Sequence, residues 1–183
     1  WTRLDLDGID DLVGDGVYYG AGRSEAAQCA GQDVVVVGAG NSAGQAVLNF
    51  ANQTARVTML VRGDRLSKSM SAYLIERIDA HPLIDVHVET QLTELHASDG
   101  QLTGVAFADS SGASETRAVD GVFLCIGGNP HTEWCSREHV ITDDRGYILT
   151  GPDLRGQAGL PDCWPLERDP LALETSRVGL FAA

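Results

Sequence analysis

The stretch DVVVVGAGNSAGQAVLNFANQTARVTMLVRGDR, residues 33–65, decides the fold class of this chain. Its opening residues, 33–37, include a run of four valines that is typical of a strand buried on both faces of a parallel sheet. After a glycine-rich turn, residues 41–53 place apolar side chains at helical spacing, and RVTMLVR, residues 56–62, supplies a second β-branched strand. Together these parts predict a βαβ unit, in which a helix connects two parallel strands.

The turn between the first strand and its helix, GAGNSA, has the GxGxxA spacing of a dinucleotide-binding fingerprint. Gly38 permits a sharp turn, and Gly40 lets the backbone approach a pyrophosphate with no Cβ in between. Ala43 lets the helix pack close to the strand, while the helix start at Asn41 and Ser42 offers unpaired N–H groups to phosphates. An incidental glycine turn is the alternative, which the strand before the turn and the helix and strand after it disfavour.

Basic residues follow the second strand, where such units distinguish one nucleotide ribose from another. An Asp or Glu about 20 residues past the glycines accepts hydrogen bonds from the 2′-hydroxyl of NAD, whereas a basic residue there accommodates the 2′-phosphate of NADP. Arg62 stands at this position, Arg65 and Lys68 follow closely, and Asp64 comes slightly late for the ribose. Because a guanidinium holds phosphate with a planar fork of donors, the segment favours NADP(H). A solvated basic loop is the alternative.

Beyond this unit the pattern predicts one more helix, an antiparallel insertion and a last parallel strand. SMSAYLIERID, residues 69–79, is expected to be helical and to end before a proline. The strand-like segments that follow contain a turn at Asp99-Gly100 and finish in the apolar run GVFLCIGG. The predicted fold class is therefore α/β, a Rossmann-like three-layer nucleotide-binding domain with a βαβ unit, a parallel sheet and a small antiparallel β insertion.

The same patterns divide the chain into three segments. Residues 1–32, rich in Gly and Asp, are expected to be a connector with one short helix at residues 24–29. Residues 33–130 form the nucleotide-binding domain. Residues 131–183 are a loop-rich return segment around one short strand at residues 147–150.

The glycines that end the last apolar strand are a further candidate site. Ile126, Gly127 and Gly128 come at the carboxyl end of a sheet strand, where Rossmann-type sheets present ligands. Their backbone is expected to border the nicotinamide ring. An ordinary strand-to-loop turn is an equally open interpretation of the two glycines.

Composition and charge limit the partners of the chain. It has 183 residues, 43% of them hydrophobic, and no apolar run near the ~20 residues of a membrane span. Thirteen basic and 26 acidic residues give a formal charge of -13, which repels nucleic acid and anionic lipid, so neither partner is expected. No signal peptide is evident, which favours the cytoplasm. Trp at position 1 and the apolar ending RVGLFAA indicate an excised piece of a longer chain.

The four cysteines do not form a metal or redox pattern. Cys29, Cys125, Cys135 and Cys163 stand far apart, and none makes a CxxC pair or a metal-ligand spacing with the five histidines. No metal site is expected. Cys125 lies in an apolar run and fits a small buried hydrophobe better than a nucleophile. No side chain is expected to act as a catalytic acid or base.

Four stretches resemble the pyridine-nucleotide domain of the thioredoxin reductase family of flavoproteins, in the branch that lacks the redox disulfide. They are GVYYGAGRSEAAQCAGQDVVVVGAGNSAGQAVLNF, VTMLVRGDRLSKSMSAYLIERI, GVFLCIGGNPHTEW and LETSRVGLFAA. The resemblance implies that a flavin domain of the parent chain binds FAD, and that hydride passes from NADPH to FAD and then to a redox acceptor protein or small molecule. It also suggests a homodimeric parent. Most of the flavin site is missing, so the isolated chain is expected to be inactive.

Two departures from the family pattern bear on function. Thioredoxin reductases carry a CxxC pair in the segment before the glycine turn, whereas VYYGAGRSEAAQCAG holds only Cys29, so dithiol relay to thioredoxin is not expected from this segment. The family's phosphate-gripping motif is His-Arg-Arg followed by a third Arg. Arg62 alone is kept, with Gly63 and Ser67 at the other arginine positions, and the two later basic residues are candidates to compensate.

Two other functions stay open. One is a non-enzymatic NADP-sensing or interaction module, in which nucleotide occupancy changes docking to a partner. The other is an NADPH:ferredoxin or flavodoxin-type reductase, which also needs no CxxC pair. Flavin-binding glycine motifs in the parent would favour the oxidoreductase over the sensor, and the electron acceptor separates the two reductases.

Overall fold

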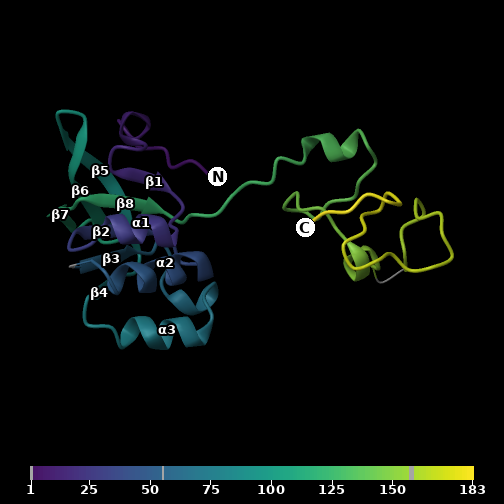
Figure 1. Cartoon of the computed structure of the whole chain (residues 1–183), viewed down its shortest axis with the longest axis horizontal. Helices are drawn as coiled ribbons and strands as arrows, with labels where there is room; N and C mark the ends of the chain where they lie inside the picture. Colours follow the sequence, from purple (N-terminus) through teal and green to yellow (C-terminus); the bar gives the residue numbers. More distant parts are fainter. Residues whose placement is uncertain (1, 55, 157–158) are drawn as a thin grey trace. The chain divides into compact units, whose positions relative to one another are not determined.

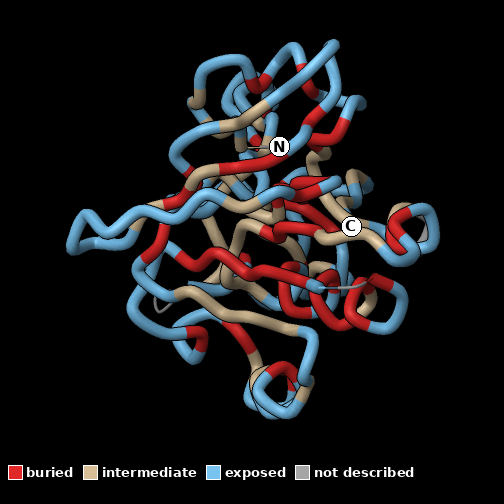
Figure 2. The backbone as a smooth tube through the Cα atoms, turned by 90° about the vertical axis from the view of Figure 1, so that its left-hand side faces the viewer, coloured by how far each residue is buried: buried red, intermediate tan, exposed pale blue. Residues whose placement is uncertain are grey.

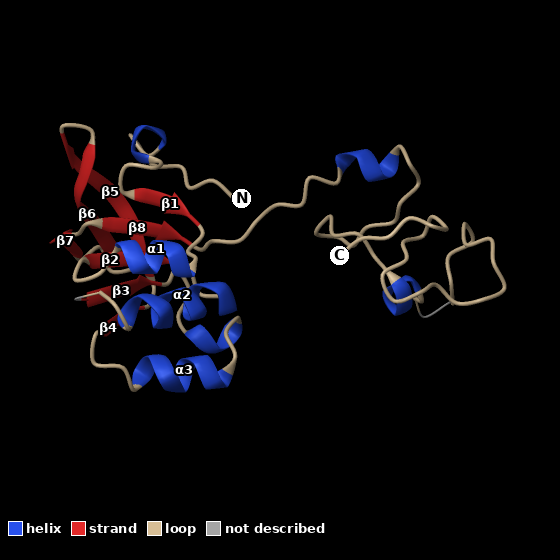
Figure 3. Ribbon diagram, in the orientation of Figure 1, coloured by secondary structure: helices blue, strands red, loops and turns tan. Residues whose placement is uncertain are grey.

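The computed structural model describes residues 2–54, 56–156 and 159–183. The chain divides into two compact units, Trp1–Gly127 and Gly128–Ala183 (Figure 1). The first unit contains the sheets and the α-helices, and the second is rich in loops (Figure 3). Among the described residues, no helix combines the length and the apolar character needed to cross a bilayer.

A parallel sheet of five strands, in the order β1-β8-β2-β3-β4, forms the centre of the first unit. Its strands are β1 (Val17–Tyr19), β2 (Asp33–Val37), β3 (Arg56–Leu60), β4 (Ile84–His87) and β8 (Gly121–Leu124). Strand β2 lies in the middle, and its buried valines serve two cores because successive side chains point to opposite faces. Val34 and Val36 join one apolar cluster and Val35 joins the other. Burial along the central strands is visible in Figure 2.

Three helices pack against one face of this sheet. They are α1 (Arg23–Gln28), α2 (Asn41–Ala51) and α3 (Ala72–Asp79), and the 3-10 helix η2 (Leu66–Lys68) precedes α3. Val47 and Phe50 of α2 pack in the same cluster as Phe123 of β8. The helix expected over residues 69–79 begins only at Ala72, because Ser71 is extended and forms its N-cap.

A small antiparallel sheet covers the other face. Strands β5 (Thr90–Ser98), β6 (Gln101–Asp109) and β7 (Ser114–Ala118) pair in that order. Leu92, Val105 and Phe107 pack in the same cluster as Val35 and Val122 of the parallel sheet. The result is a layer of helices, a parallel sheet and an antiparallel sheet, which confirms the predicted fold class (Figure 3).

The segment before β2, expected as a connector, also supplies a strand. The 3-10 helix η1 (Asp10–Leu12) comes first, and then β1 pairs in parallel with β8 along its three residues. Val17 is fully buried, and Leu12 and Ile9 pack in the same core cluster. Residues 2–32 therefore build one edge of the parallel sheet as well as helix α1.

The second unit consists mainly of loops, with the short 3-10 helices η3 (Glu133–Ser136) and η4 (Gly151–Leu154). The strand expected at residues 147–150 is wrong, since the described residues form only isolated bridges there, at Ile148 and Thr150. Gly146 and Gly151 bound this short run with positive φ angles of 85° and 49°, which prevent a longer extended segment.

A buried carboxylate organises the end of this unit. The side chain of Glu174 is 1% exposed and accepts two hydrogen bonds from the Arg168 guanidinium, at 2.7 and 3.0 Å. The backbone N–H groups of Leu171 and Gly179 also donate to it. These contacts lower the pKa of Glu174 to about 2, with the Arg168 hydrogen bonds as the largest cause.

Candidate functional site

The candidate site lies where the carboxyl ends of β2 and β8 meet. From β2 the chain continues through α2 to β3 on one side, whereas β8 pairs with β2 on the other side. The backbone N–H of Cys125, just after β8, donates to the carbonyl of Val37 at 2.8 Å. In open α/β sheets, ligands bind at such switch points, outside the carboxyl ends of the strands.

The two fingerprint glycines meet different surroundings. Gly38 has a φ of +146°, and a Cβ there would lie 2.3 Å from the Cys125 carbonyl oxygen and 3.2 Å from the Cβ of Ala43. No side chain fits at this position, so glycine lets the turn pass against the end of β8. At Gly40, by contrast, a Cβ would meet no atom within 4 Å. The space beside Gly40 is open, as the approach of a pyrophosphate requires.

The start of α2 adds unpaired donors to this open space. Gly40 is the N-cap of α2, no side chain caps the helix, and its first turn holds no acidic residue. The first N–H groups of a helix have no intrahelical partners, and the macrodipole makes this end positive. Asn41 and Ser42 are exposed, whereas Ala43 is fully buried against the sheet. An anion fits this end of the helix.

A pair of hydrogen bonds ties the glycine turn to the segment after β3. The Ser69 hydroxyl donates to the carbonyl of Ala39, and the backbone N–H of Ser71 donates to the Asn41 side-chain oxygen, both at 2.8 Å. Met70, between the two serines, packs so closely on α2 that a Cβ at Gly44 would lie 2.8 Å from its sulfur. The structure therefore brings the glycine turn and the basic segment together.

The basic segment itself is exposed to solvent. Lys68 forms an ion pair with Asp64 at 2.7 Å, and Arg65 lies 3.9 Å from the same carboxylate oxygen. The hydrogen bond from Lys68 is the main cause of a lowered pKa for Asp64. Arg62 forms no ion pair within the ranges that the structure describes. Lys68 is therefore closely paired with Asp64, Arg65 is more loosely paired with it, and Arg62 has no ion-pair partner among the described residues.

The candidate residues after β8 are divided between the two units. Ile126 is half-buried, and Gly127 is exposed with a φ of +90°. Both follow Cys125 at the carboxyl end of β8, the strand whose end lies against Gly38. Gly128 opens the second unit, where its carbonyl accepts a hydrogen bond from the Tyr147 hydroxyl at 3.3 Å.

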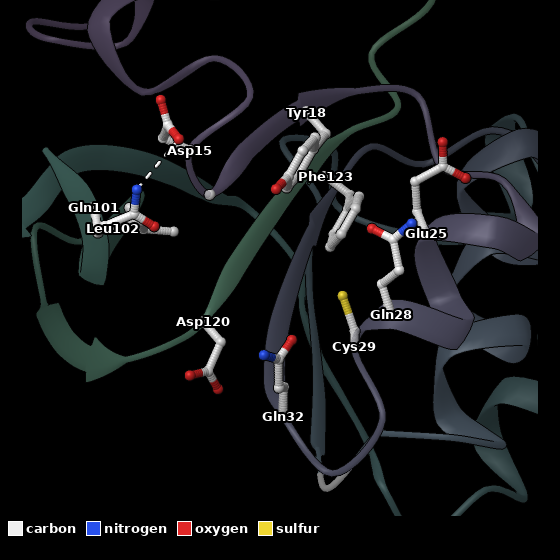
Figure 4. A pocket seen from close by; sticks show the side chains of 11 residues that line it. Asp15, Tyr18, Glu25, Gln28, Cys29, Gln32, Gln101, Leu102, Asp120 and Phe123 are labelled. Atoms are coloured by element: carbon white, nitrogen blue, oxygen red, sulfur yellow. Dashed lines mark hydrogen bonds between the residues drawn. The ribbon is translucent and has the colours of Figure 1, made fainter.

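Cys29 lies near the amino ends of β2 and β8, whereas the glycine turn follows the carboxyl end of β2. It lines a pocket of about 240 Å³ together with Gln32 and Asp120, which directly precede β2 and β8 (Figure 4). The five residues of β2, at about 3.3 Å each, separate this pocket from Gly38. Burial, followed by the nearby carboxylates of Asp120 and Glu25, raises the pKa of the Cys29 thiol.

Cys125 stands closer to the candidate site but is also a poor nucleophile. It is half-buried directly after β8, and burial raises its pKa to about 11. A protonated thiol neither attacks nor binds a metal efficiently. The residues that sequence patterns missed are Ser69, Met70 and Ser71, because no local motif reveals contacts across thirty positions of chain.

Comparisons with known proteins agree with this architecture. A thioredoxin reductase of Coxiella burnetii is 31% identical over 157 residues, which cover 80% of this chain and 48% of that protein. An alkyl hydroperoxide reductase of Staphylococcus epidermidis is 29% identical over 154 residues, covering 84% of this chain and 29% of that protein. This chain thus spans less than half the length of either relative.

Solved structures show the same fold. Thioredoxin reductase of T. acidophilum matches with a TM-score of 0.78 at 23% identity, covering all of this chain and 53% of that chain. The enzyme from Streptococcus pyogenes matches with a TM-score of 0.70 at 26% identity, covering 86% of this chain and 50% of that chain. The family model described as pyridine nucleotide-disulphide oxidoreductase matches residues 1–164. The chain therefore belongs to the pyridine nucleotide-disulphide oxidoreductase family.

Proposed function

We propose that this chain is the NADP(H)-binding domain of a thioredoxin reductase-like flavoprotein. The observation that carries the proposal is the contrast between Gly38, whose Cα lies against the Cys125 carbonyl, and Gly40, which faces open space at the start of α2. A turn of this form at a switch point holds a dinucleotide pyrophosphate. Membership of the family implies nicotinamide and flavin cofactors in general terms, and the choice of NADP(H) rests on Arg62.

Each part of the site has a separate task in this proposal. The backbone of Gly38 and Gly40 and the N–H groups of Asn41, Ser42 and Ala43 hold the pyrophosphate, and Arg62 binds the 2′-phosphate, with Arg65 and Lys68 beside it. The backbone of Ile126, Gly127 and Gly128 borders the nicotinamide. When bound, NADPH supplies a hydride for the FAD of the parent protein. The chain itself binds and orients, and none of its side chains needs to move a proton.

Nucleotide titration of the 183-residue chain by calorimetry tests this function. Wild type is expected to bind NADPH more tightly than NADH. Gly40→Val, which fills the open space beside the helix start, is expected to abolish binding of both nucleotides. Gly156→Val is the matched control, since a Cβ at Gly156 also meets no atom within 4 Å and lies in the second unit. Unchanged binding by Gly40→Val would contradict the proposal.

The position of Cys29 favours direct electron transfer from the flavin to an acceptor over a dithiol relay through this chain. A dithiol relay needs a second thiol to resolve the mixed disulfide, and the cysteine nearest to Cys29 in sequence is Cys125, at the other edge of the sheet. We therefore propose an acceptor that meets the flavin of the parent directly, as in a ferredoxin or flavodoxin-type reductase. Full-length protein reduced with NADPH and screened against thioredoxin, ferredoxin and flavodoxin distinguishes these acceptors.

A further inference from the structure

One carboxylate lies among the basic residues of the candidate site. Asp64 is two positions after Arg62, and its Oδ1 atom lies 2.7 Å from the Lys68 ammonium and 3.9 Å from Nε of Arg65. The side chains of Asp64, Lys68 and Arg65 are about half exposed, at 48%, 57% and 64% respectively. Lys68 and Asp64 are four positions apart, so this pairing is set by the local course of the chain through η2.

We infer that Asp64 sets the nucleotide selectivity of this site by occupying Lys68 and Arg65, so that Arg62 alone is free to bind a 2′-phosphate. The inference rests on the proposed function. The carboxylate acts in two ways on a phosphate at this site. It neutralises two cations that would otherwise attract the phosphate, and it adds its own negative charge nearby. The chain therefore discriminates only modestly between NADP and NAD.

The geometry also gives the unphosphorylated nucleotide a contact of its own. A carboxylate accepts hydrogen bonds from a ribose 2′-hydroxyl, and it does so while it remains ionised. The Asp64 carboxylate is ionised at neutral pH even with an ordinary pKa, and the hydrogen bond from Lys68 lowers that pKa further. Because ion pairs at such exposure are worth little, the effect of Asp64 on the two affinities is limited to a few-fold change.

The test uses the 183-residue chain, titrated by calorimetry with NADP⁺ and, separately, with NAD⁺. Asp64→Asn keeps the shape of the side chain but removes its charge. It is expected to tighten NADP⁺ binding by about threefold to tenfold, the range for one exposed charge contact, and to leave NAD⁺ binding unchanged or weaker. Asp7→Asn is the matched control, because it makes the same change of net charge at an exposed position before β1. It is expected to alter neither affinity.

The variant Lys68→Met distinguishes two effects that Asp64→Asn has on NADP⁺ binding. One is that Lys68 loses its ion-pair partner, and the other is that the negative charge of Asp64 is removed. Alone, Lys68→Met is expected to change NADP⁺ affinity by less than about twofold, because Lys68 is already engaged by Asp64. In the double variant with Asp64→Asn it should remove most of the gain, which a double-mutant cycle measures. If Lys68→Met alone weakens NADP⁺ as much as Arg62→Ala does, Lys68 is not occupied and the inference is wrong.

The outcomes also separate this inference from the proposed function. If Arg62→Ala weakens NADP⁺ while Asp64→Asn leaves it unchanged or weaker, the domain binds the nucleotide as proposed but Asp64 does not set its selectivity. If wild type binds neither nucleotide, both the proposed function and the inference fail.

Discussion

The main chain at Gly38 lies directly against the carbonyl oxygen of Cys125, and a Cβ at position 38 would be 2.3 Å from that oxygen. Atoms at that separation overlap strongly, and the obstacle is backbone rather than a flexible side chain. The contact joins the ends of β2 and β8, the two strands on either side of the switch point. The shape of the candidate site therefore depends on the absence of a Cβ at position 38.

Gly38→Ala is expected to destabilise the first unit by about 2–4 kcal/mol, from backbone strain at a positive φ together with overpacking. Urea unfolding followed by circular dichroism measures the change. Gly112→Ala is the control, because Gly112 also has a positive φ, +87°, but a Cβ there meets no atom within 4 Å. Gly112→Ala should therefore lose only the stability that corresponds to backbone strain at a positive φ. Equal losses for the two variants would mean that the contact with Cys125 adds nothing.

Arg62→Ala is expected to weaken NADPH binding by roughly 1.5–3 kcal/mol, the range for hydrogen bonds to charged groups, while changing NADH binding little. The reason is that Arg62 has no ion-pair partner within the described part of the chain and follows the end of β3. Arg56→Ala, at the other end of the same strand, is the control for net charge. A loss of equal size for both nucleotides would make the role of Arg62 structural.

The stability of the second unit should fall in acid because of Glu174. Its pKa in the folded state is about 2, against an ordinary value of 4.5, chiefly because Arg168 hydrogen-bonds to the ionised form. A depressed pKa gives stability that is complete above pH 4.5 and is lost as the pH falls toward 2. Urea midpoints between about pH 6 and 2.5 should therefore drop less steeply in Glu174→Gln than in wild type, although the variant is less stable at the upper end of that range.

Glu167→Gln provides the comparison for that acid titration. Glu167 is exposed in the same unit. Its removal should leave the pH dependence of wild type unchanged. Trp164 can report the transition, because its indole N–H donates to the Arg168 carbonyl at 2.8 Å beside the ion pair. The same slope in all three proteins would show that Glu174 is not the titrating group.

Cys29→Ser is expected to leave electron flow intact in the FAD-containing parent. The thiol lies at the amino edge of the sheet, where burial and two carboxylates hold it protonated. Stopped-flow reduction of the flavin by NADPH and turnover with an artificial acceptor should both match wild type. Normal flavin reduction with abolished turnover would place this thiol in the electron path.

The parts of the fold that sequence patterns predicted are those with local periodicity. Residues 33–60 carry their own signals, valines in β2 and apolar spacing in α2, and these elements formed as expected. Strand β1 has only three residues between Gly16 and Gly20, so its pairing with β8 decides its structure and local sequence does not. The wrong strand at residues 147–150 has the opposite cause: its β-branched residues favour a strand locally, but within the described residues Ile148 and Thr150 form only isolated bridges, each to a different segment.

The candidate site, like the fold, has parts that the sequence predicted and parts that it did not. Spacing alone identified Gly38, Gly40 and Arg62, and their roles stay predictions. The pairing of Lys68 with Asp64 is local, but sequence does not show which oppositely charged neighbours will engage each other. The strand predicted from residue 33 also puts Cys29 before the amino end of that strand, where the structure has it.

The hydrogen bonds from Ser69 to Ala39 and from Ser71 to Asn41 each join residues thirty positions apart, across a stretch that contains α2 and β3. Both hydrogen bonds form between groups of the chain itself. The glycine turn and the basic loop are thus held at a fixed spacing by the chain itself. Less conformational freedom remains to be lost on binding, so more of each contact appears as affinity. In the proposed function, Ser69 and Ser71 would then strengthen nucleotide binding by fixing the spacing of these two segments.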